Sequence, residues 1–152
     1  MALIKINNKM LEFDKVWYVD SVNGNDVNNG NLIGDPLKSL ELAINKVQPN
    51  RKEAIVIAEG QYILNAIPQT GTGYDITIIG KGSSTLIRSL NPGLAEDAEE
   101  AGNTVTVIQV VWEYTGRFLN YNYTDFYFYN SVVYVAEEIT TGFNYLGYAS
   151  HG

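Results

Sequence analysis

The chain has 152 residues, of which 45% are hydrophobic and 18% charged. This composition argues against a disordered chain and is sufficient for one domain with a buried core. The net charge is −7 and there is no run of Lys or Arg, so we expect no nucleic-acid partner. Because the chain has no cysteine and one histidine, disulfides are excluded and a zinc site would depend on carboxylates alone.

The amino-terminal segment, residues 1–15, has only a weak pattern, and it fits either an edge strand or a cap. It contains no apolar segment of the length found in signal peptides, and no stretch of about 18 apolar residues occurs anywhere in the chain. We therefore expect neither membrane insertion nor export by the general secretory route. The next run, Val16–Val19, has the composition of a strand.

A polar loop follows, from Asp20 to Asn31, with the Asn–Gly pairs that are typical of turns. Its oxygen-bearing side chains are spaced closely enough to form a calcium loop, but Asn31 stands where the EF-hand pattern requires Glu. The favoured interpretation is that Asp and Asn side chains bond to their own backbone and shape the turn. We expect no cofactor, and a Ca²⁺ site is the alternative at Asp20, Asn23, Asn25 and Asp26.

A short amphipathic helix is predicted after this loop. Asp35 is expected to accept the first free N–H groups, and Pro36 suits the first helical position because it lacks an N–H. The helix is expected to stop at Gln48–Asn50, where a proline interrupts the pattern. Apolar residues three or four positions apart form its predicted buried face: Leu37, Leu40, Ile44 and Val47.

The segment Ala54–Ile57 is an unbroken apolar run, as expected of a parallel strand covered on both faces. Three similar runs follow, and their anchor residues are 21, 29 and 21 positions apart: Ile57, Ile78, Val107 and Phe128. The longest step contains the acidic insert Asn91–Asn103. Each unit also carries a second short apolar run, respectively Tyr62–Leu64, Thr85–Ile87, Arg117–Leu119 and Val132–Val135.

Units of twenty-odd residues that contain two short strands and Gly or Asn turns are typical of a solenoid, in which neighbouring coils bury each other's apolar side chains. The chain is thus predicted to form one structural domain. Residues 1–53 supply an amino-terminal strand, the polar loop and a helix that caps the first coil. Residues 54–152 supply the coils themselves.

Several segments resemble the amino-terminal cap and first coils of the right-handed parallel β-helix, pectate-lyase-like superfamily. They are Trp17–Asp26, Asp35–Leu40, Ile55–Tyr62 and Ile78–Ile87, and the resemblance extends over residues 16–88. It implies an all-β solenoid, namely a short right-handed parallel β-helix of about four coils with an amino-terminal capping α-helix. The superfamily includes polysaccharide lyases, glycoside hydrolases, bacterial surface proteins and bacteriophage tail spikes, so the fold leaves the function open.

No catalytic residue is predicted. The insert carboxylates Glu96, Asp97, Glu99 and Glu100 lie among Pro, Gly and Ala residues, which provide no burial to raise a carboxyl pKa. Glu137 and Glu138 would point to opposite faces of a strand. The lyases of the superfamily carry their catalytic residues on later coils, and no position of this chain matches them.

Aromatic residues are concentrated in the last third of the chain. In the run Asp125–Asn130, alternation is expected to bury Phe126 and Phe128 and to expose the tyrosines between them. Outward aromatics suit sugar stacking or subunit contacts, or else they cover the flank of their own coil. The candidates for a glycan or subunit contact are Trp112, Tyr114, Tyr127, Tyr129 and Tyr134.

Two functions remain. The first is a non-catalytic structural, receptor-binding or glycan-binding module of a bacteriophage tail, located in the virion, with a bacterial surface polysaccharide as ligand and a homotrimer as the implied assembly. The second is the amino-terminal fragment of a polysaccharide lyase or glycoside hydrolase with its active site in later coils. Turnover of a bacterial polysaccharide by this chain would distinguish the second from the first.

Overall fold

The computed structural model describes residues 2–64, 73–90, 102–115, 124–135 and 148–149. Two parallel sheets form its body. The first sheet has the order β12-β10-β8-β6-β4-β3, with β3 (Lys15–Val19), β4 (Arg51–Ile57), β6 (Tyr74–Ile79), β8 (Asn103–Ile108), β10 (Thr124–Tyr129) and β12 (Tyr148–Ala149). The second has the order β11-β9-β7-β5, with β5 (Gly60–Leu64), β7 (Thr85–Leu90), β9 (Val111–Thr115) and β11 (Val132–Val135).

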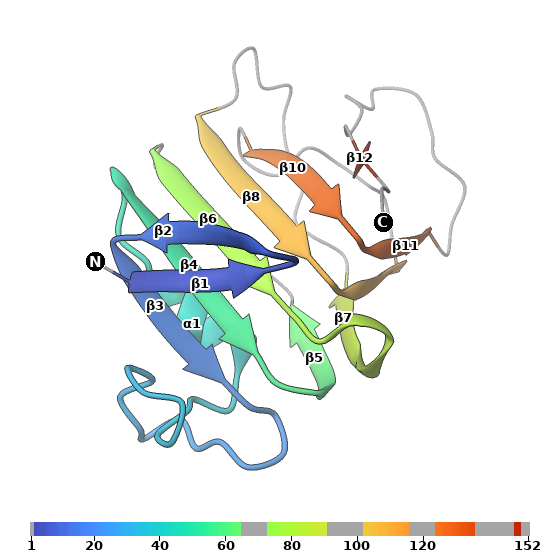
Figure 1. Cartoon of the computed structure of the whole chain (residues 1–152). Coiled ribbons are helices and arrows are strands. Elements are labelled where there is room, and N and C mark those ends of the chain that lie inside the picture. Colours follow the sequence, from blue (N-terminus) through green and yellow to red (C-terminus); the bar gives the residue numbers. More distant parts are fainter. Residues whose placement is uncertain (1, 65–72, 91–101, 116–123, 136–147, 150–152) are drawn as a thin grey trace.

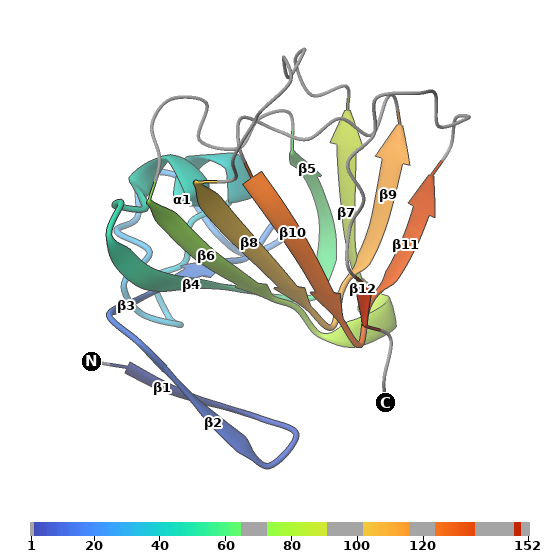
Figure 2. The same cartoon turned by 90° about the horizontal axis from the view of Figure 1, so that it is seen from above.

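Each coil contributes one strand to each sheet, which gives the four coils β4–β5, β6–β7, β8–β9 and β10–β11 (Figure 2). The predicted parallel β-helix is thereby confirmed. Short corners join the two strands of a coil, and the 3₁₀ turn η1 (Gly82–Ser84) forms part of one. Gln109 and Asn130 begin two of the corners with φ values of 57° and 48°. This left-handed backbone conformation turns the chain sharply from one sheet into the other.

The strand register matches most of the predicted columns. Ile78 pairs with Val107 and Val107 with Phe128, as the spacing predicted. In the first coil the partner of Ile78 is Ile55 rather than Ile57. The prediction was therefore wrong by two positions, a difference that leaves the same side chains facing inward because successive residues of a strand alternate between faces.

The second strand of the third coil is β9, whereas the sequence pattern placed it at Arg117–Leu119, which lies outside the described residues. Only Gln109 and Val110 separate β8 from β9, so the second strand starts almost at once. In this register Trp112 pairs with Ile87 on one side and with Val133 on the other.

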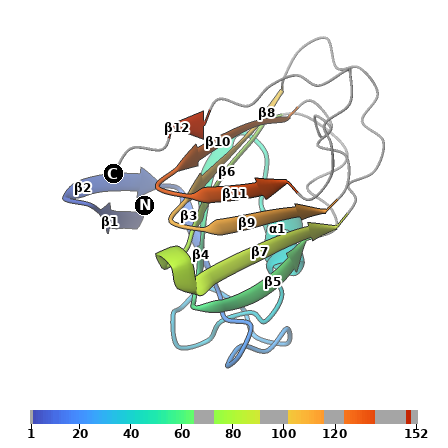
Figure 3. The ribbon, with the colours of Figure 1, turned by 90° about the vertical axis from the view of Figure 1, so that its right-hand side faces the viewer.

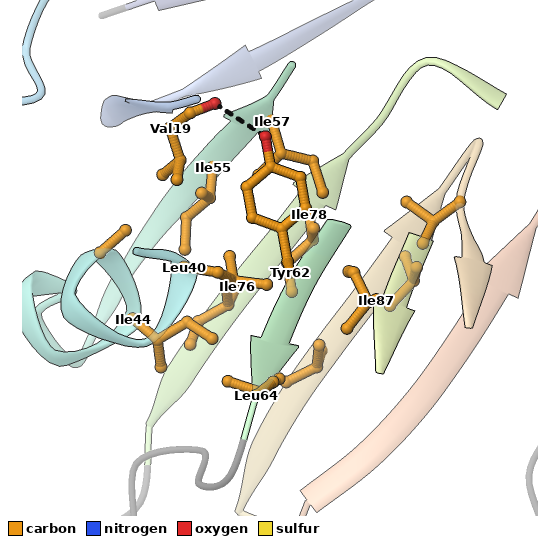
Figure 4. Close-up of a cluster of buried hydrophobic side chains, with 14 of the residues drawn as sticks. Val19, Leu40, Ile44, Ile55, Ile57, Tyr62, Leu64, Ile76, Ile78 and Ile87 are labelled. Carbon is orange, nitrogen blue, oxygen red and sulfur yellow. Dashed lines mark hydrogen bonds between the residues drawn. The ribbon is translucent and has the colours of Figure 1, made fainter. Parts of the chain in front are cut away.

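The main core lies between the two sheets and the helix (Figure 4). Apolar side chains of the first sheet point inward from successive strands and meet those of the second sheet. Burial of each such Ile or Val stabilises the fold by about 1.5–3 kcal/mol. The core columns comprise Ile55, Ile57, Ile76, Ile78, Val105, Val107, Phe126 and Phe128 on the first sheet and Tyr62, Leu64, Ile87 and Trp112 on the second.

The capping helix α1 (Leu40–Lys46) begins later than predicted. Its N-cap is Ser39, whose hydroxyl accepts the Leu42 N–H at 3.2 Å. Asp35, the predicted cap, instead accepts the N–H of Asn29. Leu37 cannot be helical because it continues the first sheet: its N–H donates to Tyr18 at 2.9 Å, and its carbonyl oxygen accepts from Asp20 at 2.8 Å.

The four residues predicted for the apolar face are all buried, although only Leu40 and Ile44 lie within the helix and Leu37 and Val47 lie outside it. The helix packs against β3, β4 and β5, where it covers the first coil. In the described part of the chain, no helix has the length and apolar character needed to cross a membrane.

The amino-terminal segment is an antiparallel hairpin of β1 (Ala2–Ile6) and β2 (Lys9–Phe13). The turn residues Asn7 and Asn8 both have positive φ, 47° and 66°, as in the tight turns that suit two-residue hairpins. The hairpin crosses the outer side of the first sheet (Figure 1). A second apolar cluster forms beneath it, with Phe13, Val16, Ala54, Ile79 and Ile108 buried.

Candidate functional site

Tyr127 and Tyr129 stand on the outer face of β10, with 39% and 43% of their surface exposed. Phe126 and Phe128 point into the core from the same strand. The predicted alternation is therefore confirmed. Because the two tyrosines are two positions apart on one face, their attachment points are about 7 Å apart. They form an exposed aromatic pair.

A groove of about 620 Å³ runs beside this pair, between the amino-terminal hairpin and the outer face of the first sheet. The hairpin contributes one wall and the sheet contributes the floor. The lining residues are Ile6, Asn7, Lys9, Leu11 and Phe13 from the hairpin, and Lys52, Asp75, Thr77, Thr104, Thr106, Ile108, Tyr127, Tyr129 and Asn130 from the sheet and its corner.

The floor is organised by the strand register into rungs, meaning residues at the same level of successive strands. One rung runs from Thr77 through Thr106 to Tyr127. The next on the same face ends at Tyr129 and includes Ile108. Hydroxyl groups and an aromatic ring thus lie side by side on one rung, and an apolar surface lies on the next. Such a combination suits a ligand that has both an apolar face and polar edges.

The charged residues of the groove are few. Lys9 and Lys52 line it together with Asp75, the only carboxylate in the lining that the structure describes. The Lys52 ammonium lies 5.4 Å from the centre of the Phe13 ring. The backbone N–H of Lys52 donates to the Asp14 carboxylate at 2.8 Å. Glycoside hydrolysis generally uses two carboxyl groups, so the described lining contains only half of such a pair.

The other predicted aromatic contacts lie elsewhere. Trp112 is 1% exposed and packs in the core, with ring centres 6.2 Å from Phe126 and 5.7 Å from Phe128. Tyr134 is exposed on β11 in the second sheet, so it faces a different side of the molecule. Tyr114 lies on β9, and its side chain is outside the described residues. Of the predicted contacts whose side chains the structure describes, Tyr127 and Tyr129 are the two that it brings together.

In the polar loop, side-chain oxygen atoms of Asp20, Asn25 and Asp26 accept hydrogen bonds from backbone N–H groups. Asp20 accepts the N–H groups of Val22 and Asn23, both at 2.9 Å, and these bonds lower the pKa of its carboxyl group, the Asn23 N–H most of all. One oxygen of Asp26 accepts the N–H groups of Lys38 and Ser39, and the Asn25 side chain accepts that of Val27. Asp20 and Asn25 thus shape the turn as predicted, whereas Asp26 connects the loop to the residues directly before α1. Among the described residues, no three acidic or histidine side chains are grouped to hold a metal ion.

The acidic candidates Glu96, Asp97, Glu99, Glu100, Glu137 and Glu138 lie outside the described residues. The hairpin wall of the groove, by contrast, was missed from the sequence. Its signal was present: two short, mainly apolar runs, Ala2–Ile6 and Lys9–Phe13, flank the pair Asn7–Asn8. Asn favours the left-handed conformation that two-residue hairpin turns require.

No protein-family model, no curated protein and no solved structure matches this chain. The groove and the exposed side chains around it are therefore the features that bear on function.

Proposed function

We propose that this chain is a non-catalytic glycan-binding or receptor-binding module of a bacteriophage tail, as part of a spike, a fibre or another virion surface protein. The observation that carries the proposal is the exposed pair Tyr127 and Tyr129 beside the groove. The bacteriophage setting is suggested by the resemblance of residues 16–88 to the parallel β-helix superfamily, and the described fold is compatible with it.

A saccharide fits the chemistry of this surface. The C–H face of a sugar ring packs on an aromatic ring, while its hydroxyl groups exchange hydrogen bonds with polar side chains at the edge. Thr104 and Thr106 provide hydroxyl groups along the floor, and Asp75 adds a carboxylate. The groove volume lies within the range of about 300–1,000 Å³ that is usual for ligand pockets.

Isothermal titration calorimetry with oligosaccharides from bacterial surface polysaccharides tests this proposal. Tyr127→Ala and Tyr129→Ala are expected to weaken binding at least tenfold each, a loss of about 1.4 kcal/mol. Tyr127→Phe keeps the ring and is expected to retain most of the affinity. Met10→Ala, on the solvent face of the hairpin, is the control and should bind as the unaltered chain does.

Unchanged affinity in both alanine variants would contradict the assignment of the groove. The same polysaccharides are incubated with the chain and assayed for new reducing ends. Product formation would contradict the non-catalytic part of the proposal and favour a polysaccharide lyase or glycoside hydrolase instead.

A further inference from the structure

The outer face of the second sheet is apolar and exposed. Ile63 on β5 is 58% exposed, and Val132 and Tyr134 on β11 are 49% and 60% exposed. Figure 3 shows the four strands of this sheet side by side, with α1 behind them. Large apolar side chains gathered on one exposed sheet face are typical of a surface that contacts another molecule.

Two rungs make up the described part of this face. The first consists of Gln61, Leu86, Val111 and Val132, and the second consists of Ile63, Arg88, Glu113 and Tyr134. The only charged groups in these two rungs are Arg88 and Glu113, which form an ion pair at 3.1 Å. The rungs therefore carry no net charge, although the whole chain has a net charge of −7.

The order of these residues is complementary to itself. Consider two copies whose second sheets face each other. A two-fold axis can lie in the plane between them, parallel to the strands and midway between β7 and β9. Rotation about it leaves each residue at its own level and exchanges β5 with β11 and β7 with β9. Ile63 then faces Tyr134 of the second copy, and Leu86 faces Val111 of the second copy.

The same rotation places Arg88 opposite Glu113 of the second copy, and Glu113 opposite its Arg88. Both charges thus gain a second partner of opposite sign. Of the described positions, only Gln61 and Val132 pair a polar with an apolar side chain. Two sheets that pack face to face lie about 10 Å apart with nearly aligned strands, which this axis permits.

We propose that the outer face of the second sheet is a self-association surface, on which a second copy of this chain packs about a two-fold axis parallel to the strands. A partner with a strong positive charge has no counter-charge to meet on this neutral face. A second copy meets matching apolar groups and two reciprocal ion pairs. The groove lies on the first sheet, so the dimer leaves it open, and the two proposals stand or fall separately.

Light scattering coupled to gel filtration of the full chain, over a dilution series, tests the proposal. The expected mass is that of two chains of 16.9 kDa each. Val111→Glu places a carboxylate opposite the apolar Leu86 of the second copy, on a central strand of the paired faces, and is expected to shift the mass to that of one chain. Val27→Glu, at a position that is 85% exposed in the polar loop, is the matched control and should remain a dimer.

A charge exchange tests the two-fold geometry itself. Arg88→Glu alone and Glu113→Arg alone each place like charges opposite each other, so each variant is expected to be monomeric. Mixed in equal amounts, they are expected to form a heterodimer, because the two carboxylates of the first variant then face the two guanidinium groups of the second. Circular dichroism of each variant establishes that it is folded.

Three results would overturn the proposal. They are a single-chain mass for the unaltered protein at every concentration, a three-chain mass as in the trimer that the family resemblance implies, and a dimer that persists in Val111→Glu. A three-fold assembly joins two different patches of each chain and would not use this self-complementary order. Glycan titration of the monomeric variant keeps this result separate from the proposed function.

Discussion

The hydroxyl group of Tyr62 donates a hydrogen bond of 2.8 Å to the carbonyl oxygen of Ala58, at the corner between β4 and β5. The hydroxyl oxygen of Tyr62 also lies 3.4 Å from the carbonyl oxygen of Val19 (Figure 4). The same hydroxyl oxygen accepts the N–H of Ser21 at 3.3 Å. One buried side chain of the second sheet thus joins the first corner to the end of β3.

Tyr62→Phe is expected to lower the free energy of unfolding by about 1–2 kcal/mol, because it leaves the Ala58 carbonyl oxygen without its side-chain donor. Denaturant titration at neutral pH measures this loss. Tyr127→Phe removes a hydroxyl group from an exposed ring and should change stability by less than about 0.5 kcal/mol. Equal effects of the two substitutions would contradict a structural role for the Tyr62 hydroxyl.

The stabilisation from Tyr62 should also depend on alkaline pH. Burial raises the pKa of Tyr62 above its usual value of 10.0. The unfolded chain therefore loses this proton at a lower pH than the folded chain does. The stabilisation that Tyr62 provides is complete below pH 10 and is lost as the pH rises through the pKa of the folded state. Denaturant titrations on both sides of pH 10 should show the gap between the unaltered chain and Tyr62→Phe becoming narrower.

Asp20→Ala tests the turn-shaping role of the polar loop. At pH 7 we expect the free energy of unfolding of this variant to be about 1 kcal/mol lower, because the N–H groups of Val22 and Asn23 lose their acceptor. The Asn23 N–H and the other hydrogen bonds lower the pKa of Asp20 below 3.8. The stabilisation that the Asp20 carboxylate provides is therefore present above pH 3.8 and is lost as the pH falls through the pKa of the folded state.

Thermal unfolding of both proteins between pH 7 and pH 2 checks this expectation, with Glu12→Gln on the exposed side of the hairpin as the control. The role of the charged carboxylate would be contradicted if the difference in melting temperature between Asp20→Ala and the unaltered chain stayed constant over this pH range.

Gly24→Ala should be strongly destabilising for steric reasons. A Cβ atom at this position would lie 2.2 Å from the Leu37 carbonyl oxygen and 2.4 Å from that of Asp20. Both acceptors are held by backbone hydrogen bonds of 2.8 Å, so neither can move without breaking the loop. We expect a loss of about 2 kcal/mol or more in denaturant titration.

Gly34→Ala is the matched control for this substitution. A Cβ atom at Gly34 would meet no atom within 4 Å, so we expect a neutral or slightly stabilising effect. A similar loss in both variants would show that the close approach at Gly24 is not the cause.

Trp112→Phe separates the core from the proposed glycan surface. Removing part of the indole leaves a space beside Phe126 and Phe128 and should cost about 2 kcal/mol in unfolding free energy. Oligosaccharide affinity of the folded variant should equal that of the unaltered chain. Reduced affinity without a loss of stability would return Trp112 to the set of ligand contacts.

Patterns within single elements predicted much of this protein. The alternation along β10 correctly assigned Phe126 and Phe128 to the core and the tyrosines to the surface. The spacing of Leu40 and Ile44 identified the face of α1 that packs on the first coil. The repeated apolar runs predicted the parallel solenoid. The signals in β10 and α1 are local, since backbone geometry alone decides which residues of one strand or helix share a face.

The relations between elements were decided by the tertiary structure. Leu37 leaves the helix because the edge of β3 offers its backbone two hydrogen bonds, and Trp112 is buried because a two-residue corner brings β9 directly after β8. Tyr127 and Tyr134, only seven positions apart, lie on different sheets for the same kind of reason. The hairpin becomes a wall of the groove only once the folded sheet offers it an apolar surface. Such outcomes depend on contacts between residues far apart in the chain, and no local period encodes them.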